Sequence, residues 1–199
     1  IFHSAAGELL PVAVFRTSGL ALGDLDRDGD LDLITGTTWD GSNETGKVLL
    51  YSNDGIGTFR DDSAARLPVQ TSEYGLTPIL GDVDADGDLD LIIAIRGLQG
   101  AQNRLYVNDG TGTFLDGTSS RLPAAYERTS CGALGDVDGD GDLDLVIGNY
   151  QQQDRLYLNN GTGTFTHHTA SGLPADSAAT NCLALGDVDG DGDVDLVFG

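Results

Sequence analysis

The sequence predicts an all-β protein, a β-propeller made of four-stranded antiparallel blades. Three observations predict it: an aspartate-rich loop occurs four times, each loop leads into an apolar β-rich run, and helix signals are nearly absent. The first aspartates of the loops, Asp24, Asp82, Asp136 and Asp187, follow one another at spacings of 58, 54 and 51 residues. A period of about fifty residues is typical of propeller blades, whereas the strands of a jelly roll do not repeat at a fixed period.

Each repeat contains four expected strands, A to D. Strand A is the short run before the loop, such as residues 20–23, and strand B is the run after it. Strand B is apolar at nearly every position, as expected for a strand buried on both faces between neighbouring sheets. Strand C then ends in an Asn-Asp-Gly or Asn-Asn-Gly turn, which supplies the positive φ angles of a tight hairpin, and a phenylalanine opens strand D. The sequences of this third part are KVLLYSNDGIGTF, NRLYVNDGTGTF and DRLYLNNGTGTF.

These units divide the chain into three full blades, residues 17–74, 75–128 and 129–179, between two partial blades. Residues 1–16 are expected to form a strand D with its return, and residues 180–199 are expected to form strands A and B. Closed propellers have about four to eight blades, so about three and a half blades leave unpaired strand edges. We therefore expect assembly with further propeller repeats or with other copies of the chain through these open edges.

The composition excludes several classes of partner. The net charge of the 199 residues is −22, and 20 of the 32 acidic residues lie in the four loops. With Lys47 and nine arginines as the only basic residues, electrostatic binding of nucleic acid or anionic lipid is not expected. No run approaches the roughly 18 apolar residues of a membrane helix, so no membrane insertion is expected. Cys131 and Cys182 are expected to be free, buried thiols, with a bridge between adjacent inner strands as the alternative.

The loop pattern Asp-x-Asp-x-Asp-Gly-Asp-x-Asp suits a calcium ion. Carboxylates at positions 1, 3, 5 and 9 can converge, position 7 can add its backbone carbonyl, and the glycine at position 6 permits a sharp turn. The number and flexibility of these oxygen ligands favour Ca²⁺ over magnesium, and the lack of neighbouring histidine or cysteine argues against zinc. An EF-hand would need a glutamate at position 12, where this chain has strand residues. The predicted calcium residues are Asp24, Asp26, Asp28, Asp30, Asp32, Asp82, Asp84, Asp86, Asp88, Asp90, Asp136, Asp138, Asp140, Asp142, Asp144, Asp187, Asp189, Asp191, Asp193 and Asp195.

These loops, together with hairpins such as NRLYVNDGTGTF, resemble the FG-GAP or VCBS-like repeats of integrin α-subunit propellers, secreted bacterial proteins and some calcium-containing propeller lectins. The resemblance covers essentially the whole chain. It implies one calcium ion at each A–B hairpin, four in all, held by the aspartates just named. It does not fix a ligand, because the family hosts adhesion, sugar binding and scaffolding on one architecture.

A calcium ion would hold each hairpin in place, because the energy of metal binding contributes to folding. Calcium near millimolar levels outside cells keeps even weak sites filled, which predicts an extracellular, secreted or cell-surface location. We expect a module that is not an enzyme and has a structural or adhesive role, since the three histidines lack partners at a telling spacing. The alternatives are a carbohydrate-binding propeller lectin and a non-catalytic domain of a larger secreted enzyme.

The B–C and D–A connections are expected at the end of the blades opposite the aspartate loops, and they hold the less regular residues. Aromatic rings, amides and a few charges can stack on and hydrogen-bond a glycan or an extracellular protein ligand. Ordinary variable loop surface is the competing interpretation. The candidate ligand-binding residues are Trp39, Asn43, Arg96, Tyr126, Asn149 and Tyr150.

Overall fold

The structure, a computed structural model, describes residues 16–38, 46–69, 74–175 and 177–199. The expected strand D within residues 1–16 and the candidate ligand residues Trp39 and Asn43 lie outside the described residues.

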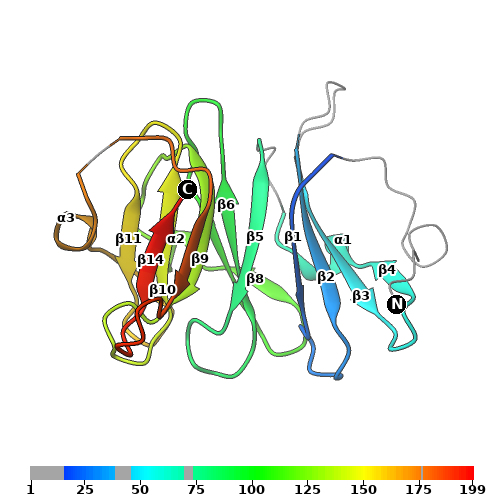
Figure 1. Cartoon of the computed structure of the whole chain (residues 1–199). Helices are drawn as coiled ribbons and strands as arrows, with labels where there is room; N and C mark the ends of the chain where they lie inside the picture. The colour runs from blue at the N-terminus through cyan, green and yellow to red at the C-terminus, as the bar shows by residue number, and fades with distance from the viewer. Residues whose placement is uncertain (1–15, 39–45, 70–73, 176) are drawn as a thin grey trace, which may run out of the picture.

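Three antiparallel four-stranded sheets follow one another along the chain, and a two-stranded sheet comes after them (Figure 1). The first sheet contains β1 (Arg16–Gly23), β2 (Asp32–Thr38), β3 (Val48–Asn53) and β4 (Phe59–Asp61). The second contains β5 (Leu76–Gly81), β6 (Asp90–Ile95), β7 (Arg104–Asn108) and β8 (Phe114–Asp116). The third contains β9 (Thr129–Gly135), β10 (Asp144–Asn149), β11 (Arg155–Leu158) and β12 (Thr166–His167), and the last contains β13 (Leu183–Gly186) and β14 (Asp195–Phe198).

In every full sheet the strands pair in chain order, so each sheet is the meander A to D that the sequence predicts. The inner strands A lie next to one another: β1 packs beside β5, β5 beside β9 and β9 beside β13. Three full blades and a partial blade that stack through their faces confirm the predicted fold class, an all-β propeller arrangement of four-stranded antiparallel blades.

A single helical turn follows strand D in each full blade, which the sequence did not predict. These turns are α1 (Ser63–Arg66), α2 (Thr118–Arg121) and α3 (Thr169–Gly172). Each begins with a hydroxyl side chain that accepts a hydrogen bond from a strand C backbone N–H, at 2.9 Å for Ser63 and 3.1 Å for Thr118 and Thr169. The hydroxyl therefore continues the hydrogen bonding of strand C where the short strand D has ended.

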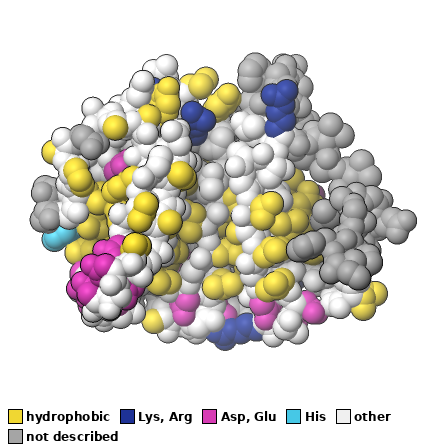
Figure 2. Space-filling view, viewed as in Figure 1, with side chains coloured by type: hydrophobic (Ala, Val, Ile, Leu, Met, Phe, Trp, Pro, Cys, Tyr) yellow, Lys and Arg dark blue, Asp and Glu magenta, His cyan; other side chains and the backbone are white. Residues whose placement is uncertain are grey.

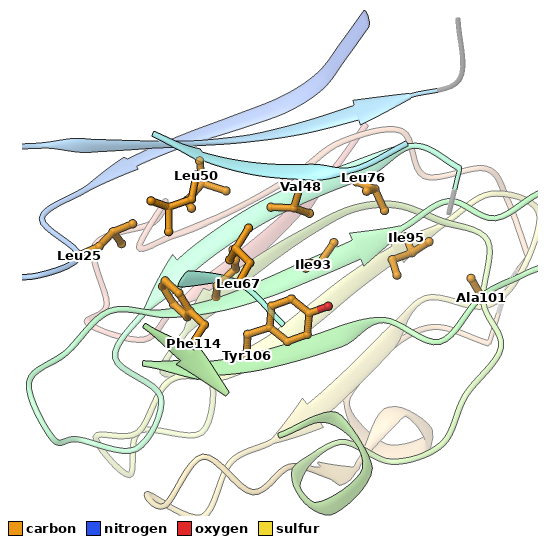
Figure 3. Packing of buried hydrophobic residues seen from close by; sticks show 12 residues of the cluster. Leu25, Val48, Leu50, Leu67, Leu76, Ile93, Ile95, Ala101, Tyr106 and Phe114 are labelled. Carbon is orange, nitrogen blue, oxygen red and sulfur yellow. The ribbon is translucent and has the colours of Figure 1, made fainter. Parts of the chain in front are cut away.

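The core lies between the sheets (Figure 3) and explains why strand B is apolar throughout. In β6, Leu91 and Ile93 belong to a buried cluster shared with the first sheet, whereas Ile92 belongs to one shared with the third sheet. Successive side chains of a strand point to opposite faces, so both faces of β6 are buried. Every residue of β6 and of β10 is buried, as predicted for strand B.

Neighbouring blades approach closely at the glycine that ends strand A in each of the three full blades. A Cβ atom at Gly23 would lie only 2.6 Å from a methyl carbon of Leu89 and 3.0 Å from one of Leu80, both in the next blade. We call such a glycine a socket and the leucines that fill it knobs. The other pairs are Gly81 with Leu134 and Leu143, and Gly135 with Leu185.

Both cysteines are free, as predicted, but the prediction that both are buried is wrong. Cys131 in β9 is half-buried, and burial raises the pKa of its thiol to about 11. Cys182, just before β13, is exposed. The sheet that it precedes has only two strands in the described chain, so fewer neighbours cover it.

Candidate metal sites

The four aspartate loops join strands A and B at the same end of the molecule (Figure 1), where Figure 2 shows acidic side chains gathered. The glycine at position 6 has a left-handed backbone in each loop, with φ values of 92° at Gly29, 88° at Gly87, 94° at Gly141 and 98° at Gly192. Glycine adopts this conformation without steric cost, as the sequence analysis expected of these four residues.

The aspartate at position 9 fixes each loop against its own blade. In the second blade, Asp90 is buried; its Oδ2 accepts a hydrogen bond from the backbone N–H of Val83 at 3.1 Å, and its Oδ1 accepts one from Asn108 at 2.9 Å. Asp32 and Asp144 make the same pair of bonds in their blades. One carboxylate thus joins position 2 of the loop to the end of strand C.

Burial has an electrostatic consequence for these three carboxyl groups. Burial raises the pKa of Asp90 to about 6, with the backbone hydrogen bonds from Asn108 and Val83 opposing the shift and the charges of Asp84 and Asp86 adding to it. Burial is also the main reason why the pKa values of Asp32 and Asp144 are raised. A bound cation would favour the ionised form of these groups instead.

In each loop, three carboxylates bring one oxygen atom apiece to within 4.8 Å of one another. Positions 1 and 3 take part in every loop, and position 5 or position 9 supplies the third oxygen. The sets are Asp24, Asp26 and Asp28; Asp82, Asp84 and Asp86; Asp136, Asp138 and Asp144; and Asp187, Asp189 and Asp195.

Three carboxylate oxygens in these sets are buried and have no hydrogen-bond partner: Oδ1 of Asp24, Oδ1 of Asp26 and Oδ1 of Asp84. A buried charged oxygen without a partner costs free energy, and neighbouring carboxylates repel one another. A cation among them would remove both costs. Because all the donors are hard oxygen atoms on a short flexible loop, the residues present fit a calcium ion.

The remaining predicted calcium residues lie elsewhere in the loops. At position 7, Asp88 and Asp142 place their carboxylates under the glycine of the C–D turn, where a Cβ would lie 2.7 Å from Asp88 and 2.6 Å from Asp142. The side chain of position 7 therefore packs against the turn, and its backbone carbonyl remains the group predicted to bind a cation. The side chain of Asp30 lies against Gly55 in the same way. In the third and fourth loops, Asp140 and Asp191 accept hydrogen bonds from the N–H groups of Asp142 and Asp193.

Two arginines that the sequence analysis missed complete the first two sites. Arg66 of α1 donates to Oδ2 of Asp26 at 2.9 Å and to the carbonyl of Thr111, in the next blade, at 3.3 Å. Arg121 of α2 does the same with Asp84 at 2.9 Å and Thr162 at 2.8 Å. In Asp26 and Asp84, at position 3 of the first two loops, one carboxylate oxygen accepts the arginine hydrogen bond and the other is the buried oxygen without a partner. The sequence feature that marks these two arginines is the repeated Arg-Leu-Pro, and the third blade has Gly-Leu-Pro in its place.

Three residues gather between the second and third blades, on the connections opposite the aspartate loops. The guanidinium carbon of Arg96 lies 5.4 Å from the centroid of the Tyr150 ring, and that of Arg128 lies 4.8 Å from it. Both distances are within the range of cation–π contact. The structure therefore joins two of the predicted ligand residues and adds Arg128 to them.

The two other described ligand candidates differ from each other. Asn149 is fully buried, and its side-chain amide donates to the carbonyl of Gln153 at 2.9 Å, so it supports the chain fold and is not placed to touch a ligand. Tyr126 is exposed and lines a cavity of about 500 Å³ together with Gln102 and Arg104.

In the part of the chain that the structure describes, no helix is long and apolar enough to cross a membrane.

Stacked four-stranded blades, each with an aspartate-rich loop at its A–B turn, define a β-propeller built from acidic-loop repeats. The chain belongs to the FG-GAP-like repeat family, which matches residues 24–93, 82–147 and 136–198. This membership confirms the resemblance drawn from the loops and hairpins.

The chain is also similar to individual proteins. Over 146 residues, 65% of this chain, it is 30% identical to cartilage acidic protein 1 of Xenopus tropicalis, of which it covers 20%. Among solved structures, it is similar to an Agrocybe aegerita lectin described for its specific recognition of non-reducing terminal N-acetylglucosamine. That match has a TM-score of 0.46 and 16% identity, and it covers 90% of this chain and 59% of the lectin chain.

Position 4 of the loops yields a matched pair of substitutions. Its backbone is left-handed, with φ of 59° at Ala85 and 78° at Gly139. Because a side chain in this conformation costs about 1 kcal/mol, Ala85→Gly should raise the free energy of unfolding by about that amount. Gly139→Ala should lower it similarly, since nothing lies within 4 Å of a Cβ there. Denaturant unfolding of both variants in calcium measures the effects, and shifts of the same sign would contradict the prediction.

Proposed function

We propose that the chain is a calcium-stabilised, extracellular β-propeller module that is not an enzyme and that has a structural or adhesive role. The observation that carries the proposal is the clustering of three carboxylate oxygens in each of four equivalent loops, with buried oxygens that lack partners in two of them. Calcium would be held by the carboxylates at positions 1, 3, 5 and 9 and by the carbonyl of position 7. When bound, its double positive charge neutralises part of the charge of the five aspartates in a loop.

Contacts between loops explain why calcium would stabilise the whole array of blades. The side-chain amide of Asn108 donates both to Leu89 of its own loop, at 3.1 Å, and to Leu25 of the preceding loop, at 2.8 Å. Arg27 of the first loop also forms an ion pair with Asp88 of the second, at 2.5 Å. An ion that orders one loop therefore also supports the adjacent blade.

An extracellular location is supported by two considerations. The loops carry the oxygen ligands that calcium prefers, and millimolar calcium outside cells would keep even weak sites of this kind occupied. The chain is also similar to a protein named for cartilage, although it spans only 20% of that protein's length. A rigid set of blades suits a structural or adhesive role, because the B–C and D–A connections are then presented on a fixed support.

Removing calcium tests the proposal directly. Isothermal titration should give four ions per chain, and a chelator should lower the thermal unfolding midpoint, since a site filled at 100 times its Kd contributes about 2.7 kcal/mol. Asp138→Ala should reduce the count to three and destabilise mainly the third blade. Asp142→Ala is the matched control, because it keeps the position-7 carbonyl and should retain four ions. Two or fewer ions in millimolar calcium would disprove the proposed sites.

The raised pKa values predict opposite pH dependences with and without calcium. In chelator, the folded state binds a proton at Asp90 with a pKa of about 6, above the ordinary value of 3.8. Stability from this group is therefore present at low pH and is lost as pH rises through about 6, by up to roughly 3 kcal/mol. In calcium, stability should rise with pH instead, because protons compete with the ion.

Thermal unfolding between pH 4.5 and about 7, with and without calcium, measures this reversal. Asp90→Asn should reduce the slope seen in chelator, because the substituted side chain does not titrate, while Asp32 and Asp144 keep part of it. A calcium-free protein whose stability rises with pH across this range would contradict the assignment.

Carbohydrate binding is a second candidate function, favoured by the exposed ring of Tyr126 at the 500 Å³ cavity with Arg104 and Gln102. This volume is in the usual range for small-molecule sites. On a glycan array with and without calcium, saturable binding to a defined sugar should be lost in Tyr126→Ala. Leu98→Ala is the control, an exposed apolar residue that does not line the cavity. An array with no signal would contradict carbohydrate binding and leave the structural or adhesive role as the proposed function.

A further inference from the structure

Two arginines beside Tyr150 have no acidic partner within the described chain. The guanidinium carbons of Arg96 and Arg128 lie 5.4 Å and 4.8 Å from the centroid of the Tyr150 ring. Among the described residues, neither guanidinium donates a hydrogen bond to an acceptor, and Nε of Arg128 is buried without a partner. By contrast, five other arginines each form an ion pair with a carboxylate: Arg27, Arg60, Arg66, Arg121 and Arg155.

Leaving these two positive charges unpaired costs free energy. A buried nitrogen donor without an acceptor is unfavourable, and two guanidinium groups over one ring repel each other. The cation–π contacts with Tyr150 offset part of this cost. An anion that accepts hydrogen bonds from both groups would remove the repulsion. Since a guanidinium group matches the oxygens of a carboxylate or a similar oxyanion with two parallel hydrogen bonds, the pair suits an anionic group of this shape.

The arginine pair is a feature of one blade boundary and not of the repeat. Arg96 and Tyr150 hold equivalent positions, each 14 residues after the first aspartate of its loop, and Arg128 lies 8 residues before the first aspartate of the third loop. At the boundary of the first and second blades, the three equivalent positions hold Thr38, Tyr74 and Arg96, so only one cation is present there. This local departure from the repeat indicates a requirement other than blade packing.

Backbone hydrogen bonds hold the three residues in fixed places. The N–H of Tyr150 donates to the carbonyl of Arg128 at 2.8 Å, and the N–H of Arg128 donates to Oε1 of Gln152 at 2.7 Å. The N–H of Arg96 donates to the carbonyl of Gly75 at 2.9 Å. A site that is already ordered loses less conformational entropy when it binds a ligand.

The cavity of about 500 Å³ lies on the same two connections as the arginine pair. Tyr126, which lines it, lies two residues before Arg128, and Ala101, which also lines it, lies five residues after Arg96. Ala101 and Glu127 join the two connections through backbone hydrogen bonds of 2.8 Å and 3.1 Å. The cavity and the two cations therefore belong to one part of the surface.

The negative charge of the chain does not fill this part of the surface. The neighbouring carboxylate, Glu127, is buried, and its Oε1 accepts hydrogen bonds from Arg155 at 2.6 Å and Tyr157 at 3.1 Å. The six residues of β6 separate Arg96 from the second aspartate loop by about 20 Å, which exceeds the screening length of about 8 Å at physiological ionic strength. Figure 2 shows Lys and Arg side chains at the upper edge of the view, opposite the gathered acidic side chains.

We propose that Arg96, Arg128 and Tyr150 form an anion site that binds the carboxylate or sulfate group of an acidic saccharide, whose sugar rings lie toward the cavity at Tyr126. The two guanidinium groups donate to the anion, and the Tyr150 ring holds them together. A saccharide is favoured over an acidic peptide because the cavity has the volume of a small-molecule site and the exposed ring of Tyr126 can stack on a sugar. The inference deepens the second candidate function, carbohydrate binding, and rests on it for the sugar part of the ligand.

Isothermal titration with three tetrasaccharides, in millimolar calcium at physiological ionic strength, tests the proposal. Hyaluronan carries carboxylates alone, chondroitin sulfate carries carboxylates and sulfates, and chitotetraose is neutral. At least one acidic tetrasaccharide should bind at least about tenfold more tightly than chitotetraose. Binding of hyaluronan would assign the anion as a carboxylate, and binding of chondroitin sulfate alone would assign it as a sulfate. Equal binding of all three, no binding, or tighter binding of a hexaglutamate peptide would overturn the proposal.

Substitutions then locate the site. Arg96→Gln and Arg128→Gln should each weaken binding of the acidic tetrasaccharide at least about tenfold, because each removes a charged hydrogen-bond donor. Arg16→Gln is the matched control: Arg16 is exposed and is the equivalent of Arg128 in the first blade, so this variant should bind like the wild type. Arg96→Gln should also keep the thermal unfolding midpoint, since the Arg96 side chain is exposed and unpaired in the described chain. An acidic tetrasaccharide that binds both glutamine variants like the wild type would contradict the assigned site.

The outcomes separate this inference from the proposed function. A chain that binds four calcium ions but no acidic saccharide would overturn the anion site and leave the calcium-stabilised module intact. Binding of a neutral sugar alone would support carbohydrate binding and overturn the anion site. A chain that binds no calcium, yet binds the acidic tetrasaccharide through Arg96 and Arg128, would overturn the calcium sites and support the anion site.

Discussion

The arrangement of this protein depends on one buried carboxylate in each of its three full blades, the aspartate at position 9 of the loop. Asp90 holds the backbone of the loop with one oxygen and the end of strand C with the other. The asparagine held at that strand end then reaches the preceding loop. Loop conformation, strand pairing and blade stacking thus meet at one side chain, whose burial would be costly without these hydrogen bonds.

Polar contacts at the loop end and apolar contacts between the sheets have different roles. Leu91, Ile92 and Ile93 alternate between two core clusters and fill the space on both faces of β6, where apolar burial favours the packing of the sheets. Apolar burial alone does not fix the register of one sheet against the next. The directional bonds of Asn108 and Arg66 do so, because each needs a particular carbonyl of the neighbouring blade.

Local patterns in the sequence were sufficient for the strands, the turns and the aspartate loops. The period of the repeat, the apolar strand B and the glycine at position 6 each reflect a requirement within one blade. Contacts between blades were harder to predict from the sequence. Arg66 and Asp26 are 40 residues apart, and the repeated Arg-Leu-Pro marks the arginine without indicating which aspartate it contacts. Asn149 was predicted to be a surface amide because a polar loop follows it, but it is buried, and its side chain hydrogen-bonds Thr129 and Gln153 of its own blade.

The repeated interface also bears on how a chain of this kind can change length during evolution. The socket at Gly23 receives Leu80 and Leu89, and the socket at Gly81 receives the equivalent Leu134 and Leu143. A gene duplication that inserts one whole repeat therefore provides new knobs and a new socket together, and no contact is left unmatched. Insertion of part of a repeat would separate them. Selection on such genes should consequently favour changes of whole repeats, with breakpoints at equivalent positions of two blades.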